Sequence, residues 1–144
     1  MNRFSVTFLD KKARLYTCNR EVYNNLFLKY KSFCTLEDIL CQTMMGDEIT
    51  FYVYEKMNDI TNSINHHIFQ KICTVDPRLY LVINIHEDVP GIDHIGIIHH
   101  ISGYFLKKQI PILYINIYGY NLVLVSDEYL TQVQDIFNEI AYVS

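Results

Sequence analysis

The stretch IPILYINIYGYNLVLVSDEYL, from Ile110 to Leu130, carries more information about the fold than any other part of the chain. Two apolar runs flank Tyr118-Gly119, where glycine permits the positive φ that a tight hairpin needs. Ser126 ends the second run and is a residue type that caps helices, while Asp127-Glu128 would favour the first helical turn. The stretch therefore predicts a strand, a turn, a second strand and a helix.

The segments on either side of this stretch extend the pattern. Upstream, RLYLVINI (Arg78 to Ile85) is an apolar run of strand length, which predicts a strand buried on both faces. After a loop at Pro90-Gly91, Asp93 is expected to cap a helix. Helical spacing predicts core faces on the two helices, formed by Ile97, Ile98, Ile101 and Phe105 on the first and by Leu130, Val133, Phe137 and Ile140 on the second.

The first half of the chain repeats this plan more loosely. FSVTFL and ARLYT are predicted as two strands around a turn at Asp10–Lys12, followed by a helix through Tyr30 that Asn19 is expected to cap. FCTLED and EITFYVYEK are predicted as two more strands with a loop near Gly46, and a helix over 58–71 is an open alternative. Asp76-Pro77 marks a junction. We therefore expect an α+β fold with mainly antiparallel sheets, helices on one face, and two units at residues 1–75 and 76–144.

Composition narrows the classes of protein. The chain has 144 residues, is half hydrophobic and carries a net charge of −4, without a concentrated basic cluster. Nucleic-acid binding is disfavoured because phosphate neutralisation needs such a cluster. The apolar runs are too short to span a membrane and the N-terminus does not resemble a signal peptide, so a cytoplasmic protein is expected. The four cysteines form no CxxC motif and are expected to be free thiols: Cys18, Cys34, Cys41 and Cys73.

Catalytic and metal motifs are absent from the sequence. The adjacent histidine pairs His66-His67 and His99-His100 would point about 100° apart on a helix, and no pair has the i, i+4 spacing of helical zinc ligands. We expect no metal site, no cofactor and no enzymatic activity. An enzyme that uses the Pro90-Gly91 loop stays an alternative, and its functional residues would be His86, Glu87, Asp88 and His94. The tyrosines around the hairpin either pack on the sheet or form an aromatic binding surface.

The second half resembles the ACT domain, a regulatory βαββαβ module. It is most similar to the tandem ACT repeats of cytosolic arginine sensors and to bacterial ACT-like regulatory proteins. The resemblance rests on Gly96, on the helix segment IGIIHHISGYFLKKQ, on the strand IPILYI and on NIYGYNLVLV before an acidic helix start. Asn116 and Ile117 stand where the family often has Ser and Thr, and Asn121 replaces an Asp. Residues 1–75 resemble a degenerate unit of the same kind.

The resemblance implies a function and a site. Family ligands lie between ACT units, so it implies a regulatory protein that binds an amino acid or similar metabolite at an inter-unit cleft. The implied ligand-binding residues are Gly96, Ile110, Pro111, Ile112, Asn116, Ile117 and Asn121, with further loop contacts from Asp88, Asp93 and His94. Because the arginine sensors carry two double units, this chain is expected to form a homodimer. The alternative is an adaptor without a ligand, which would bind an unidentified protein partner.

Overall fold

The computed structural model describes residues 4–29, 39–55, 70–87, 96–117 and 120–143. Backbone contacts divide the chain into two compact units. Unit 1 comprises Met1–Asp10 and Tyr80–Ser144, and unit 2 comprises Lys11–Leu79. The sequence predicted the division between residues 75 and 76, whereas the structure has it between Leu79 and Tyr80. The structure also assigns the first ten residues to the C-terminal unit, so unit 2 is inserted within the sequence of unit 1.

The first strand, β1 (Phe4–Asn19), takes part in both units. The predicted turn at Asp10–Lys12 is wrong, because the strand continues through these residues for a total length of 16. The three residues include neither glycine nor proline, and nothing else forces a reversal there. From Lys12 onward, eight consecutive residues pair antiparallel with β3 (Glu48–Glu55). Long-range pairing therefore keeps this polar segment extended.

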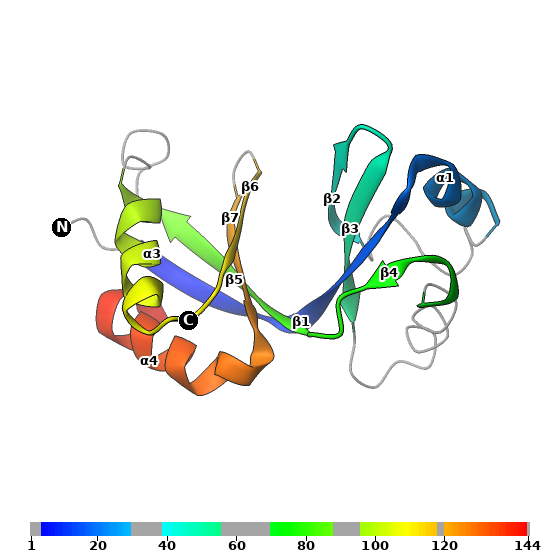
Figure 1. The fold of residues 1–144 in the computed structure, drawn as a ribbon. Helices are drawn as coiled ribbons and strands as arrows, with labels where there is room; N and C mark the ends of the chain where they lie inside the picture. Colours follow the sequence, from blue (N-terminus) through cyan, green and yellow to red (C-terminus); the bar gives the residue numbers. More distant parts are fainter. Residues whose placement is uncertain (1–3, 30–38, 56–69, 88–95, 118–119, 144) are drawn as a thin grey trace. The chain divides into compact units, whose positions relative to one another are not determined.

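Unit 1 contains a mainly antiparallel sheet with both helices on one face (Figure 1). The strands lie in the order β1, β5 (Tyr80–Glu87), β7 (Tyr120–Ser126) and β6 (Leu113–Ile117). A short strand, β8 (Tyr142–Val143), pairs in parallel with β1. Thr7, near the start of β1, lies beside His86, near the end of β5, with Oγ1 and Nε2 3.1 Å apart. The strand from the start of the chain thus completes the sheet of the C-terminal unit.

The core of unit 1 lies between its sheet and two helices, α3 (Ile97–Lys107) and α4 (Leu130–Ile140). Buried residues from the helices pack against buried residues of β1, β5 and β7: Ile101, Phe105, Val133, Ile136 and Phe137 against Phe4, Val6, Ile83, Ile85, Val123 and Val125. Two predicted core residues are wrong, since Ile98 is 46% exposed and Leu130 is 39% exposed. On α4, Val133 and Phe137 are buried as predicted, and Ile136 is buried as well, although it was not predicted to lie in the core. β5 and β7 confirm the strands predicted at 78–85 and 120–125, although β5 begins at Tyr80 instead of Arg78. The burial predicted for the first of these strands is confirmed as well.

The helix starts in unit 1 differ from the predictions. The N-cap of α3 is Gly96, which has a φ of 99°, so the predicted cap at Asp93 is wrong. Ser126 precedes a short 3-10 helix, Asp127–Tyr129, and its side chain makes no capping hydrogen bond. α4 then begins at Leu130. Main-chain geometry therefore defines both starts.

Unit 2 contains α1 (Arg20–Lys29), the hairpin of β2 (Ile39–Met45) and β3, the second part of β1, and β4 (Thr74–Val75). Gly46, with a φ of 60°, and Asp47 connect the hairpin, which confirms the predicted loop. The predicted cap of α1 is also confirmed, because Asn19 Oδ1 accepts from the Val22 N–H at 2.8 Å. The core consists of Tyr16, Cys18, Ile49, Phe51 and Val53. The predicted strand FCTLED and most of the open helix at 58–71 lie outside the described residues.

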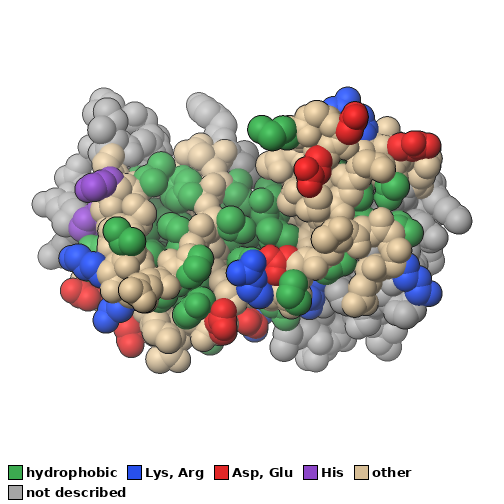
Figure 2. All heavy atoms as spheres, viewed as in Figure 1, with side chains coloured by type: hydrophobic (Ala, Val, Ile, Leu, Met, Phe, Trp, Pro, Cys, Tyr) green, Lys and Arg blue, Asp and Glu red, His purple; other side chains and the backbone are tan. Residues whose placement is uncertain are grey.

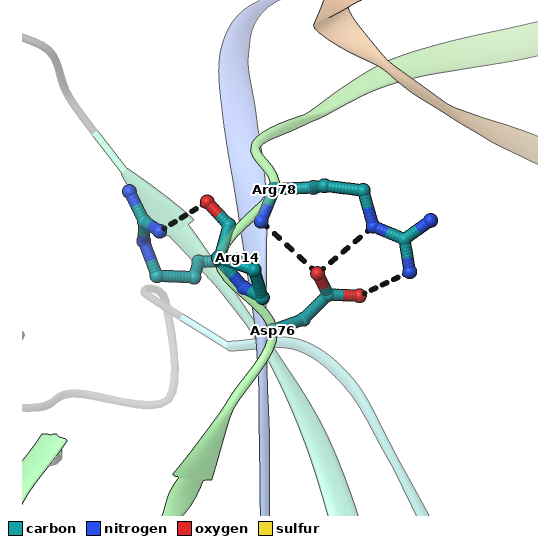
Figure 3. A network of polar contacts seen from close by, with 4 residues as sticks. Arg14, Asp76 and Arg78 are labelled. Atoms are coloured by element: carbon teal, nitrogen blue, oxygen red, sulfur yellow. Dashed lines mark hydrogen bonds and ion pairs between the residues drawn. The ribbon is translucent and has the colours of Figure 1, made fainter.

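A polar network closes unit 2 after β4 (Figure 3). The Arg78 guanidinium donates to Oδ1 and Oδ2 of Asp76, each at 3.0 Å. The Arg78 backbone N–H also donates to Oδ1, at 3.0 Å. Arg14 on β1 donates to the Pro77 carbonyl at 3.3 Å. The ion pair is 54% exposed on the arginine side, so its contribution to stability is modest. The network fixes the turn at Asp76-Pro77, where the sequence predicted a junction.

Candidate functional site

The described part of the predicted site lies on unit 1, in two neighbouring strands and two connecting segments. Asn116 and Asn121 stand directly opposite each other on β6 and β7. Gly96 precedes α3, while the segment Ile110–Ile112 connects α3 to β6. Asp88, Asp93 and His94 lie outside the described residues, as does the side chain of Ile117. The described side chains of the predicted site therefore belong to the two asparagines and the segment Ile110–Ile112, and Gly96 adds its backbone.

The asparagine pair forms a small hydrogen-bonded cluster with Tyr114. Asn121 Oδ1 accepts from Asn116 Nδ2 at 2.9 Å and from the Tyr114 hydroxyl at 3.1 Å. Asn121 is buried, with 6% of its surface exposed, while Asn116 is exposed. A buried amide needs such partners because an unsatisfied polar group is costly. The cluster therefore combines a fixed interior amide with an exposed one at the surface.

Tyr114 was not among the predicted site residues. The sequence left open whether this tyrosine packs on the sheet or forms an aromatic surface. In the structure it does pack against the core of unit 1, and its hydroxyl reaches Asn121. The signal that would have identified it is the diagonal relation between positions 114 and 121 on paired antiparallel strands.

The cluster is electrically neutral. Neither β6, with the sequence LYINI, nor β7, with the sequence YNLVLVS, contains an acidic or basic residue. A neutral amide offers both donors and acceptors, but it lacks the charge that would offset the desolvation of a cationic group. The chemistry of the cluster fits a ligand group that is neutral and polar.

The connecting segments contribute backbone rather than polar side chains. Ile110 is 5% exposed and its N–H donates to the Phe105 carbonyl at 3.0 Å, which fixes the end of α3. Pro111 is exposed and supplies no N–H. An alanine Cβ built at Gly96 would meet nothing within 4 Å, so the need for glycine there comes from its positive φ. No neighbouring group lies close enough to exclude a side chain at Gly96.

The residues of the enzyme alternative are only partly described. His86, at the end of β5, is exposed and contacts Thr7. Asp88 and His94 lie outside the described residues, as does the side chain of Glu87. Among the residues that the structure describes, no group of three or more histidine, cysteine or acidic side chains is arranged to hold a metal ion. No helix within the described ranges is long and apolar enough to cross a membrane.

The surface of unit 1 beside the strands is largely apolar. Figure 2 shows hydrophobic side chains gathered between α3 and the strands of this unit, with histidine side chains over α3. Two apolar residues of α3 are exposed, Ile98 by 46% and Leu106 by 77%. His100 makes edge contacts with the rings of Phe4 and Tyr104, at centroid distances of 6.4 and 5.2 Å. This histidine is thus held by aromatic packing.

No protein-family model matches the chain, and no curated protein does. Solved structures do. The fold is similar to that of an Agrobacterium tumefaciens protein, with a TM-score of 0.70 and 13% identity over 100% of this chain and 94% of the other. It is also similar to a Vibrio cholerae protein of unknown function described as a possible transport protein, with a TM-score of 0.67 and 12% identity over 96% and 90% of the two chains.

A third similar structure is E. coli aspartokinase III in complex with aspartate and ADP. The TM-score is 0.57 with 12% identity, and the match covers 90% of this chain but only 31% of the aspartokinase chain. Aspartokinase III contains ACT domains, so this likeness supports an ACT-like α+β fold. At these identities the likeness concerns the fold alone. The predicted tandem of ferredoxin-like units, of which the first is degenerate, stays a prediction.

Proposed function

We propose that this protein is a non-enzymatic regulatory protein that binds an amino acid or a similar small metabolite through unit 1. The observation that carries the proposal is the ACT-like arrangement of β5, α3, β6, β7 and α4, together with the hydrogen-bonded Asn116–Asn121 pair at the position implied by the resemblance. The likeness to part of aspartokinase III supports the same assignment. The ligand acts by stabilising one conformation over another, to the extent of its differential affinity.

The neutral cluster narrows the class of ligand. Asn121 replaces the acidic residue that the resemblance would lead one to expect, and β6 and β7 add no charge of their own. A cationic side chain would lose its hydration there without gaining a counter-charge. We therefore propose that the ligand is an amino acid or metabolite whose side chain is neutral.

The test is thermal unfolding of the full chain with each of the twenty amino acids at millimolar concentration. A ligand that binds only the folded state adds about 2.7 kcal/mol at 100 times its Kd, which raises the melting temperature visibly. We expect a rise with one or a few neutral amino acids and none with arginine or lysine. Asn116→Ala should reduce the rise, whereas Met45→Ser, at an 86% exposed residue of unit 2, should leave it unchanged. A rise with arginine alone would overturn the neutral-ligand assignment.

A second function, an adaptor without a ligand, is favoured by the exposed apolar residues of α3. Ile98 and Leu106 lie two turns apart on one side of this helix, where a partner could cover them. We propose a second copy of the chain as the partner. Light scattering should then report a dimer, which Leu106→Glu converts to a monomer. Because the sensor is also expected to form a homodimer, the ligand effect is the deciding result: its absence would favour the adaptor over the sensor.

A further inference from the structure

Two of the cysteines lie opposite each other in unit 2. β1 and β4 pair antiparallel, with Tyr16 opposite Val75 and Thr17 opposite Thr74. Cys73 directly precedes β4, and continuing the same register by one step places it opposite Cys18. Both residues pack in the core cluster of unit 2, so their side chains are on the same face of the strands. The two thiols are hydrogen bonded to each other.

The hydrogen-bond pattern defines the geometry of this pair. The Asp76 N–H donates to the Leu15 carbonyl at 3.0 Å, so Leu15 and Asp76 form a hydrogen-bonded pair of the antiparallel ladder. Such pairs alternate with non-hydrogen-bonded pairs, and three steps along the ladder Cys18 and Cys73 fall at a non-hydrogen-bonded position. Opposite Cα atoms are about 4.5 Å apart there, near the short end of the range of about 4.4–6.8 Å that disulfides span.

We infer that Cys18 and Cys73 are a site of reversible disulfide formation, which links β1 to the start of β4. The oxidant is a hydroperoxide, with hydrogen peroxide as the simplest case. One thiol loses its proton, and the resulting thiolate attacks a peroxide oxygen and becomes a sulfenic acid. The O–O bond breaks, and the departing hydroxide takes up that proton and leaves as the first water. The second thiol then attacks the sulfenic sulfur: the S–S bond forms, the S–O bond breaks, and the departing hydroxide takes the proton of that thiol and leaves as the second water. Two thiols and one peroxide thus give one disulfide and two waters.

The surroundings of the two thiols determine how readily this occurs. Burial raises the pKa of Cys73 to about 12, and burial also raises the pKa of Cys18, although the hydrogen bond from Cys73 opposes that rise. Since the thiolate is the reactive form, oxidation is slow at neutral pH and accelerates as the pH rises.

The bond would close a loop that contains α1, β2 and β3. Residues 19–72 lie between the two cysteines, so the link would restrict the unfolded chain strongly and stabilise unit 2. It would also hold the helical residues Gln70–Ile72 against β1. In the reduced protein, this segment is held to β1 by the short β1–β4 pairing; in the oxidised protein, a covalent bond would hold it as well.

The experiment uses the full chain with Cys34→Ser and Cys41→Ser, which leaves only the proposed pair. After treatment with hydrogen peroxide at about pH 9, we expect the intact mass to fall by two hydrogen atoms and a peptide map to show Cys18 joined to Cys73. The melting temperature should rise by about 10 °C and return on reduction. The matched control adds Cys18→Ser, which leaves Cys73 alone and should show none of these changes.

The outcomes decide the proposal. The proposal is supported if the variant that keeps Cys18 and Cys73 loses two hydrogen atoms and stays a single chain, while the control with Cys18→Ser does not change. Addition of oxygen atoms alone, a disulfide between two chains, or two unchanged thiols would each overturn it. If the serine substitutions impair folding, the same peptide map on the wild-type chain answers the question, because a Cys18–Cys73 peptide is distinct from any peptide that contains Cys34 or Cys41.

Discussion

Asn116 and Asn121 face each other across β6 and β7, and Asn116 Nδ2 donates to Asn121 Oδ1 over 2.9 Å. The Tyr114 hydroxyl donates to the same oxygen. One buried amide therefore serves as the acceptor for two side chains on the neighbouring strand. This relation makes the stability of unit 1 sensitive to position 121 in a measurable way.

Asn121→Leu should lower the free energy of unfolding by about 1–3 kcal/mol, because Tyr114 and Asn116 lose their common acceptor. Urea unfolding followed by circular dichroism measures the change. Asn116→Ala is the matched control: it removes one exposed donor and should cost less than about 1 kcal/mol. Equal losses for the two variants would contradict the role assigned to Asn121.

The two described glycines of the α3 region should respond oppositely to alanine. Gly103→Ala should stabilise by up to about 1 kcal/mol, because alanine is the better helix former and its Cβ would meet nothing within 4 Å. Gly96→Ala should destabilise by about 1 kcal/mol, because its φ of 99° is unfavourable for any residue with a Cβ. Melting temperatures of the two variants, measured side by side, check this. Stabilisation by both would show that α3 starts elsewhere.

Asn19→Ala should destabilise the protein by about 1 kcal/mol, because Asn19 Oδ1 accepts the Val22 N–H at the start of α1. Asn19→Asp keeps an acceptor oxygen at the same place and should retain nearly the full stability. Urea unfolding of both variants provides the measurement. A loss in the aspartate variant as large as that in the alanine variant would mean that the cap is not what stabilises α1.

Stability should fall at alkaline pH, in part through Cys41. Burial raises the pKa of this thiol from 9.0 to about 11. Because the folded pKa exceeds the unfolded one, the stabilisation is complete below about pH 9 and is lost as the pH rises through about 11. Urea midpoints between about pH 8 and about pH 11 should decline less steeply for Cys41→Ala than for the wild type. Parallel declines in both proteins would exclude a contribution from this thiol.

The parts of the fold that could be predicted are those in which local pattern and burial agree. β5 and β7 are continuous apolar runs, and they form strands buried on both faces. Val133 and Phe137 were found from helical spacing because α4 has one apolar side and one polar side. Ile98 was misplaced because several isoleucines follow one another at the start of α3, so that spacing alone does not determine which of them faces the core.

The parts that could not be predicted depend on long-range pairing. The Asp10–Lys12 segment is polar and looks like a turn, yet β3 pairs with the strand from Lys12 onward and keeps it extended. The opposition of Cys18 and Cys73 follows from the β1–β4 register, which 55 positions of separation hide in the sequence. The candidate site shows the same limit. Asn116 and Asn121 were found through a family resemblance, whereas Tyr114 required the strand register.

The path of β1 affects how the protein is made. Phe4–Asp10 is synthesised before unit 2, but its partner β5 begins only at Tyr80, after all of unit 2 has been synthesised. Unit 2 can therefore fold on the nascent chain while the first strand segment waits with unpaired edges. An unpaired strand is a template for association with other chains. Slow translation beyond residue 79 should consequently prolong the period in which this strand segment is open to association with other chains.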